Sequence, residues 1–326
     1  MANDSIPLSP VLRIEPASAC NLRCSHCPTG VFEMARTVMK QDVFRRVLEE
    51  LRRNVPPIRV VVMYHGGEPF LNKNFLSMAR RIKDVGVPFV KTVSNGMLIE
   101  PVLAEQIIDS GLDVIEISLD GQSGEQNNRV RRRSDWATVV GNVRHLAERV
   151  AARGSSLKIL IATTQFLASD SNPKADPDVP NWLRDAFSGL ESRVAFKSTW
   201  ALKWPSQLPA EGYDTIEEGP PREAPEMCSL LQETLTVRAD GRVVACCFDL
   251  TSMSNLGNIL DQSLTEIWNG PGYKAFREDF ARRNYPPLCR NCAVVTGRSF
   301  LVPAQEGTAI SNHQLRDDSL AAGGQE

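Results

Sequence analysis

Residues 20–27 of the chain read CNLRCSHC, which places three cysteines in a C-x3-C-x2-C spacing. Three thiolates on one short loop can bind three irons of a [4Fe–4S] cluster and leave the fourth iron without a protein ligand. Clusters that only carry electrons are usually held by four cysteines, so an open iron indicates a place where a small molecule binds. The spacing therefore predicts chemistry at a cluster whose ligands are Cys20, Cys24 and Cys27.

Zinc and disulfide bonds are the alternatives for these cysteines. Structural zinc often takes two C-x2-C pairs, and the chain contains such pairs at Cys24–Cys27 and Cys289–Cys292. The additional Cys20 fits that arrangement poorly. Disulfides are disfavoured because the sequence has no secretory signal and its cysteines fall into two tight groups. Ligand type and spacing favour iron–sulfur for the first group.

The composition is that of a soluble globular protein, with 326 residues and a formal net charge of −2. The length suits one large domain and a smaller one. A nearly neutral charge gives no reason to expect nucleic acid or an acidic membrane as a partner. Apolar runs such as Val60–Tyr64 are far too short to span a bilayer. These features predict a cytoplasmic protein, and a reducing cytoplasm also suits an oxygen-sensitive cluster.

Short apolar runs alternate with amphipathic patterns over the first two-thirds of the chain. The expected strands are Val11–Ala17, Arg59–Tyr64, Phe89–Ser94, Val114–Ser118, Leu157–Thr164 and Arg193–Ser198. Expected helices include Gln41–Asn54 and Asp135–Ala152, each with one apolar stripe. Six strand–helix units predict an α/β fold, a partial (β/α)6 TIM-like barrel with a parallel sheet. Reactive groups in such folds gather on loops after the strands, as Cys20–Cys27 does.

A different, smaller unit follows the barrel. Five prolines make residues 204–225 an expected linker. Beyond it, the turn Ala239-Asp240-Gly241 between two apolar runs predicts a hairpin, and short helices are expected at Leu264–Trp268 and Tyr273–Arg282. The unit contains all five remaining cysteines, and a domain this small would gain stability from a bound metal.

These boundaries predict five segments. They are an N-terminal extension (1–9), the barrel (10–203), the linker (204–225), a small C-terminal iron–sulfur domain (226–300) and a disordered tail (301–326).

Four motifs at the ends of the expected strands, and a fifth segment after the last of them, make the chain resemble the radical S-adenosylmethionine (SAM) superfamily. The cysteine loop is that superfamily's signature. YHGGEP at 64–69 is similar to its GGEP motif, and SNG at 94–96 to its TNG-type motif. SLDG at 118–121 and NRVR at 128–131 resemble its ribose-contacting and carboxylate-binding segments.

The resemblance implies a set of SAM-binding residues. These are Gly66, Gly67 and Glu68 near the amino group, Ser94 and Asn95 in the next loop, Ser118 and Asp120 at the ribose, and Arg131 at the carboxylate. Simpler roles stay open: glycines also make tight turns, Ser and Asp also cap helices, and arginine runs are often only solvated. His26 has the position of an aromatic residue that packs near adenine, and it could also be exposed.

The second cysteine group resembles the twitch domain, a shortened SPASM domain. The implied ligands are Cys228, Cys246, Cys289 and Cys292, enough for one auxiliary [4Fe–4S] cluster, with structural zinc as the alternative. Cys246 is favoured over Cys247 as the ligand. Cys247 is then a spare thiol, either a small buried hydrophobe or a hydrogen donor that quenches a substrate radical.

The resemblance also implies the reaction. A reductase such as flavodoxin or ferredoxin reduces the cluster, SAM is cleaved to a 5′-deoxyadenosyl radical, and the radical takes hydrogen from a small-molecule substrate. Chain length and cysteine content resemble the aminocyclitol dehydrogenase and aminoglycoside epimerase members of antibiotic biosynthesis. We therefore expect oxidation of an alcohol on an amino sugar, aminocyclitol or sugar nucleoside. Epimerisation or decarboxylation, peptide or protein maturation, and a non-catalytic metal-binding scaffold are the alternatives. Residues 165–178 and 200–205 are expected to shape the substrate pocket.

Overall fold

The computed structural model describes residues 6–168, 176–205, 212–219 and 225–304. One nine-stranded sheet forms the centre, in the order β12-β11-β10-β1-β3-β4-β5-β7-β8. Its parallel neighbours from the first two-thirds of the chain are β1 (Val11–Ile14), β3 (Val60–Val62), β4 (Phe89–Ser94), β5 (Val114–Ser118), β7 (Lys158–Gln165) and β8 (Val194–Trp200). Each overlaps one of the expected strands, so the predicted α/β fold with a six-stranded partial barrel is confirmed.

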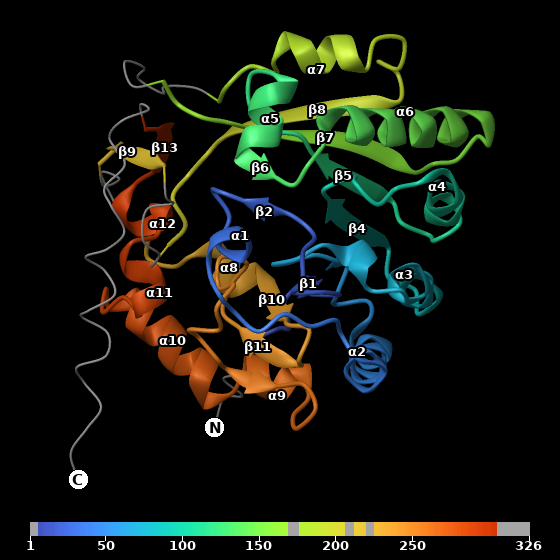
Figure 1. The fold of residues 1–326 in the computed structure, drawn as a ribbon. Helices are drawn as coiled ribbons and strands as arrows, with labels where there is room; N and C mark the ends of the chain where they lie inside the picture. The colour runs from blue at the N-terminus through green and yellow to red at the C-terminus, as the bar shows by residue number, and fades with distance from the viewer. Residues whose placement is uncertain (1–5, 169–175, 206–211, 220–224, 305–326) are drawn as a thin grey trace.

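Helices cover the outer side of this arc of strands (Figure 1). They include α2 (Gln41–Asn54), α3 (Phe75–Asp84), α4 (Pro101–Ile108), α6 (Trp136–Ala152) and α7 (Asn181–Ala186). In α2 the expected apolar stripe is buried against the sheet, which is what holds an amphipathic helix in place. Asp135, expected as the first helical residue, instead caps α6 by accepting a hydrogen bond from the Ala137 amide.

The carboxyl ends of the parallel strands meet at one edge of the sheet, where short elements form the loops. The first loop contains β2 (Arg23–Cys24) and α1 (Pro28–Val31). After β3 comes the 3-10 helix η1 (Pro69–Leu71), and after β5 come α5 (Gly124–Val130) and β6 (Arg131–Arg132). Strand β6 pairs antiparallel with β2. The loop that contains the cysteines is thus joined directly to the loop that follows β5.

The C-terminal unit continues the barrel sheet. Strand β10 (Thr234–Val237) pairs parallel with β1, and β11 (Arg242–Val244) and β12 (Gly257–Asn258) extend the sheet antiparallel. The expected hairpin is confirmed as β10–β11. Its helices are α8 (Ser229–Glu233), α9 (Leu264–Trp268), α10 (Pro271–Ala281), α11 (Pro287–Arg290) and α12 (Ala293–Thr296). Helix α10 begins two residues earlier than expected because Pro271 occupies its first turn.

Two segment predictions need correction. The expected linker, 204–225, contains β9 (Tyr213–Glu217), and the expected tail begins inside β13 (Ser299–Pro303). These two strands pair antiparallel, and Phe300 and Leu301 are buried. The proline content of residues 204–225 made β9 unrecognisable in the sequence. The apolar run 300–302 has no partner strand near it in the chain and pairs only with the distant β9. Residues 305–326 lie outside the described part of the chain, so a disordered tail there stays a prediction.

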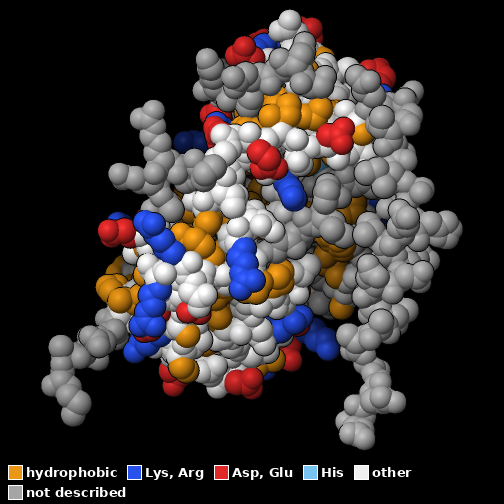
Figure 2. Space-filling model, turned by 90° about the vertical axis from the view of Figure 1, so that its left-hand side faces the viewer, with side chains coloured by type: hydrophobic (Ala, Val, Ile, Leu, Met, Phe, Trp, Pro, Cys, Tyr) orange, Lys and Arg blue, Asp and Glu red, His pale blue; other side chains and the backbone are white. Residues whose placement is uncertain are grey.

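The main core lies between the sheet and the outer helices. Both acidic and basic side chains are exposed on the side of the molecule that Figure 2 shows, with hydrophobic side chains between them. Within the described residues, no helix combines the length and the hydrophobicity needed to cross a membrane.

Candidate active site

The three cysteines of the first loop line one cavity of about 470 Å³ at the carboxyl edge of the sheet. Backbone hydrogen bonds keep the loop tight: the Cys27 amide donates to the Cys24 carbonyl oxygen at 3.3 Å, and the Gly30 amide donates to the Cys27 carbonyl oxygen at 2.8 Å. A Cβ atom on Gly30 would lie 2.1 Å from the Cys24 carbonyl oxygen, so only glycine fits there. The structure therefore brings Cys20, Cys24 and Cys27 to one cavity, as predicted.

The chemistry of this loop suits a cation. Burial raises the pKa of all three thiols, that of Cys24 to about 12. A buried thiolate is stable only beside positive charge, which bound iron supplies and to which Arg131 adds. All eight cysteines of the chain are free thiols. The loop thus fits a cluster held by three cysteines.

The GGEP segment packs directly on the cysteine loop. The Glu68 amide donates to the Ala19 carbonyl oxygen at 2.8 Å. A Cβ atom on Gly67 would lie 2.3 Å from that same oxygen and 2.4 Å from the Ala17 carbonyl oxygen. The close approach of the two backbones therefore requires glycine at 67. Gly66, Gly67 and Glu68 all line the cavity, as the resemblance implied.

The Glu68 carboxylate joins two loops. It accepts hydrogen bonds from the Ser94 hydroxyl at 2.9 Å, the Asn95 amide at 2.8 Å and the Phe70 amide at 3.2 Å. Burial raises the pKa of Glu68 to about 7. In turn the Asn95 side chain donates to the Asn21 side-chain oxygen at 2.8 Å. Glu68 therefore holds the SNG loop against the cysteine loop, and direct contacts of Glu68, Ser94 and Asn95 with SAM stay predictions.

Asp120 and Arg131, predicted to contact different parts of SAM, are paired with each other. The Arg131 guanidinium lies 2.7 Å from the Asp120 carboxylate, and the His26 ring lies 3.4 Å from it. Burial alone would raise the pKa of Asp120, but Arg131 and His26 outweigh it and hold the pKa well below its usual range. His26 is mostly buried, edge-on to Phe166. Two groups here, His26 Nδ1 and Arg131 Nε, are buried without a hydrogen-bond partner in the described chain. These groups and Ser118, which lines the same cavity, are available to a ligand.

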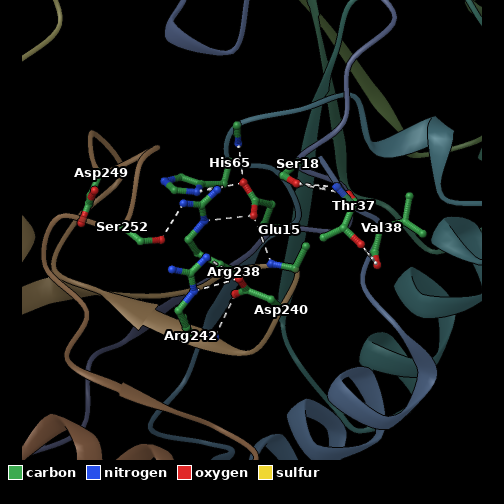
Figure 3. A network of polar contacts seen from close by, with 12 residues as sticks. Glu15, Ser18, Thr37, Val38, His65, Arg238, Asp240, Arg242, Asp249 and Ser252 are labelled. Carbon is green, nitrogen blue, oxygen red and sulfur yellow. Dashed lines mark hydrogen bonds and ion pairs between the residues drawn. The ribbon is translucent and has the colours of Figure 1, made fainter. Parts of the chain in front are cut away.

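Glu15, which follows β1, is a site residue that the sequence analysis missed. Its buried carboxylate accepts hydrogen bonds from the Gly66 amide at 3.1 Å and the Ala239 amide at 3.0 Å. It also contacts His65 at 3.2 Å and Arg238 at 3.2 Å (Figure 3). Burial acts to raise the pKa of Glu15, but His65, Arg238 and the Ala239 amide lower it to about 2. The signal for this residue was a carboxylate directly after a short strand.

Four of the five C-terminal cysteines were predicted as ligands, and the structure gathers all five. Cys228, Cys246 and Cys289 are buried in one small core. Burial and the neighbouring cysteines raise the pKa of Cys246 well above its usual value. The pKa of Cys292 is raised by burial and, less strongly, by Cys228 and Cys247. Within the described chain no such group surrounds a point where a single metal ion would sit. The donor chemistry fits an auxiliary cluster, and the choice of Cys246 over Cys247 stays a prediction.

The far wall of the cavity comes from residues 199–204 and Phe248. The rings of Trp204 and Phe248 meet edge-on, with their centroids 5.3 Å apart. Trp200–Trp204 belongs to a segment expected to shape the substrate pocket; these residues line the cavity, and their role in substrate binding stays a prediction. Phe248 and Thr199 were missed, because no local motif marks a residue that reaches the cavity from a distant element. Of the expected loop 165–178, residues 169–175 lie outside the described part.

Family models match both parts of the chain. The model "Radical SAM superfamily" matches residues 14–161, and SPASM, "Iron-sulfur cluster-binding domain", matches residues 228–293. Together the two matches cover more than half of the chain, and each contains one of the two cysteine groups.

Curated relatives are distant. The chain is 23% identical over 323 residues to a tungsten-containing aldehyde ferredoxin oxidoreductase cofactor-modifying protein of Pyrococcus furiosus, covering 87% of each chain. It is 27% identical over 176 residues to a probable GTP 3′,8-cyclase of Methanocaldococcus jannaschii, and this match spans 55% of that relative.

Solved structures share the fold. BtrN in complex with AdoMet and 2-DOIA has a TM-score of 0.56 and 16% identity, with 87% of this chain and 93% of that chain covered. Streptococcus suis SuiB bound to S-adenosylmethionine has a TM-score of 0.57 and 15% identity, with 84% and 69% covered. Accordingly, the protein binds a [4Fe–4S] cluster with SAM, and its SPASM domain binds auxiliary iron–sulfur. The motifs, the cavity and these matches show that the chain belongs to the radical SAM superfamily, as an enzyme with a C-terminal SPASM domain.

Proposed function

We propose that this enzyme oxidises an alcohol carbon of a carbohydrate-type small molecule, such as an amino sugar, an aminocyclitol or a sugar nucleoside, in natural-product biosynthesis. The observation that carries the proposal is the cavity of about 470 Å³ between the cysteine loop and residues 199–204. The cluster and SAM would occupy the part of this cavity at the cysteine loop, and the substrate would bind at the wall of residues 199–204. The fold shared with BtrN, whose structure contains 2-DOIA, supports this substrate class.

The lining suits a ring that carries hydroxyl groups. Trp204 and Phe248 supply apolar groups, and Thr164 and Thr199, which are paired on neighbouring strands, supply hydroxyls. Binding sites for small molecules combine apolar walls with a few polar groups that set orientation. A substrate held on this wall would face the cysteine loop.

The cluster, when reduced with SAM bound, supplies a 5′-deoxyadenosyl radical that abstracts hydrogen from a C–H bond. The protein's part is positioning. Cys20, Cys24 and Cys27 would hold the cluster, while Glu68 fixes the loop beside it and Asp120 fixes Arg131. The proposed SAM contacts of Gly66, Gly67, Ser118 and Arg131 would orient the sulfonium toward the cluster.

In the proposed reaction one SAM and one alcohol give methionine, 5′-deoxyadenosine, a ketone and a proton. One electron cleaves SAM, and one electron returns when the substrate radical loses its hydroxyl proton. The SPASM cysteines would hold the cluster that receives this second electron. Epimerisation or decarboxylation would use the same first step without that net oxidation.

The test uses anaerobically reconstituted enzyme, dithionite, SAM and a panel of aminocyclitols, amino sugars and sugar nucleosides labelled with deuterium at the hydroxyl-bearing carbons. We expect 5′-deoxyadenosine that contains deuterium and a product lighter by two hydrogens. The triple substitution of Cys20, Cys24 and Cys27 by Ala should abolish SAM cleavage. Cleavage that persists in this variant, or a panel without any deuterium transfer, would refute the proposal.

A peptide substrate is the second candidate. SuiB bound to the precursor peptide SuiA shares the fold, with a TM-score of 0.53 and 14% identity. A labelled peptide library in the same assay separates the two candidates.

Cys247→Ala tests the predicted hydrogen donor: an epimerase should lose its product and keep SAM cleavage, whereas a dehydrogenase should be little affected. Membership of an enzyme family overturns the further alternative of a non-catalytic metal-binding scaffold.

A further inference from the structure

Arginines gather on the ribbon of β2 and β6. The register places Arg23 opposite Arg132 and Cys24 opposite Arg131. Arg132 and Arg133 are exposed, and so is Arg129 in the last turn of the adjoining helix α5. Arg23 is half-buried and donates to the carbonyl oxygens of Cys20 and Leu22 at 3.4 and 3.2 Å. We name the set Arg23, Arg129, Arg132 and Arg133 the arginine ribbon.

The arginine ribbon brings several positive charges close together. Among the residues that the structure describes, none of its members forms an ion pair with a carboxylate, whereas the neighbouring Arg131 is paired with Asp120. Like charges directly opposite each other on two strands are unfavourable. Arg133 also has a φ of 73°, a conformation that costs a non-glycine residue free energy. Such an arrangement fits a surface that an acidic partner completes.

The ribbon adjoins a cluster ligand. Cys24 is itself a residue of β2, and neighbouring strands lie about 4.8 Å apart. A protein bound on the ribbon would therefore approach the first cluster more closely than one bound on the outer helices. Close approach of the two redox centres is what electron transfer between proteins requires.

We propose that the arginine ribbon is the docking surface for an acidic one-electron donor protein of the flavodoxin or ferredoxin type. This inference rests on the radical SAM chemistry of the proposed function, which needs one electron at the cluster held by Cys20, Cys24 and Cys27. In the docked complex the donor's reduced cofactor loses one electron and the cluster gains it, with no bond formed or broken. Opposite charge on the two surfaces speeds their association and sets their orientation.

The test compares two electron sources, dithionite and a purified acidic flavodoxin kept reduced by its reductase. The variant is Arg132→Glu with Arg133→Glu, in which the carboxylate introduced at position 132 would face Arg23 and keep the two strands paired. At low salt, flavodoxin-driven formation of 5′-deoxyadenosine should fall about tenfold and lose most of its salt dependence. The dithionite-driven rate should stay within about twofold, because a small reductant needs no docking surface.

The chain offers a matched control, Arg282→Glu with Arg283→Glu. This pair is also exposed, also has a positive φ at its second residue (60° at Arg283), and lies at the end of α10, where Arg282 pairs with Glu278 at 3.3 Å. We expect it to leave both rates near those of the unmodified enzyme. An equal loss in this control would overturn the proposal, because the effect would then reflect net charge alone.

Direct binding of oxidised flavodoxin to the immobilised enzyme gives a readout independent of turnover. The ribbon variant should bind about tenfold more weakly, and the control should bind normally. Binding unaffected by the variant, or an equal fall of the dithionite-driven rate, contradicts the docking surface. Absence of any dithionite-driven cleavage in the unmodified enzyme would instead refute the proposed function, and the binding measurement would still decide the docking surface.

Discussion

At the scale of single residues, Glu68 shows how burial and hydrogen bonding oppose each other. Its carboxylate accepts three hydrogen bonds that favour the ionised form. Complete removal from water favours the protonated form and prevails, so that the pKa rises to about 7. A group of this kind is poised to titrate near neutral pH while it holds two loops of the site together.

The raised pKa of Glu68 predicts a pH-dependent stability. The ordinary pKa is 4.5, so the folded protein binds this proton more tightly than the unfolded chain does. The stability that the proton contributes is fully present below pH 4.5 and is lost as pH rises through 7, about 3 kcal/mol in all. We expect Glu68→Gln to flatten the change in thermal midpoint between pH 5 and 8, measured by anaerobic thermal unfolding.

Glu105→Gln is the control for this experiment, because Glu105 is only partly buried and Arg149 and Arg153 lower its pKa. That variant should keep the slope of the unmodified enzyme. A Glu68→Gln variant with the full slope would show that another group titrates in this range.

At the scale of elements, the close contact of two loops decides the site. The GGEP segment after β3 lies against the residues that lead from β1 into the cysteine loop, and Gly67 makes the approach possible. Neither β1 nor β3 needs a glycine at position 67 for its own backbone conformation. The constraint arises only where the two loops meet.

Gly67→Ala should therefore damage the site. Its Cβ atom would lie within 2.4 Å of two backbone oxygens, which cannot move aside as a flexible side chain can. We expect separation of the two loops and loss of SAM binding by at least about tenfold. Equilibrium dialysis of the reconstituted enzyme with labelled SAM measures this loss.

Gly141→Ala is the matched control. Gly141 lies within α6, and no atom comes within 4 Å of the position that its Cβ atom would take. The change should therefore be neutral or stabilise the helix by about 0.5–1 kcal/mol. Equal loss of SAM binding in both variants would count against the contact at Gly67 as the cause.

At the scale of the whole molecule, two buried carboxylates join the barrel to the SPASM domain. Glu15 binds Arg238 and the Ala239 amide, as Figure 3 shows. Glu50 on α2 accepts a hydrogen bond from the Leu264 amide at 2.9 Å and pairs with Arg53 at 2.8 Å. Together with the pairing of β10 on β1, these contacts make the two parts one folded body.

Replacing Glu15 and Glu50 in turn distinguishes a carboxylate that only joins the two domains from one that also affects SAM binding. Glu15→Gln leaves Arg238 buried without its counter-charge, so the free energy of unfolding should fall by about 3 kcal/mol. Because Glu15 also binds the Gly66 amide, SAM should bind about tenfold more weakly, equivalent to about 1.4 kcal/mol. Thermal unfolding and SAM dialysis measure the two effects.

Glu50→Gln should lower the stability and leave SAM binding unchanged, because Glu50 lies on the outer helix α2. Weakened SAM binding in this control would mean that general loosening of the domain contact, and not the Gly66 hydrogen bond, affects the site.

The local features of this protein follow from short-range patterns in its sequence. The cysteine spacing, the apolar strands and the stripe of α2 act over a few residues, so the cluster loop, the six parallel strands and the GGEP segment beside the loop were predicted. Tertiary structure alone decided the pairing of β10 with β1 and of β9 with β13, and it paired Asp120 with Arg131. The two strand pairings join segments far apart in the chain. The Asp120–Arg131 ion pair brings together two residues that were predicted to contact different parts of SAM. The free energy of these contacts comes from burial and charge neutralisation, which exist only once the chain has packed.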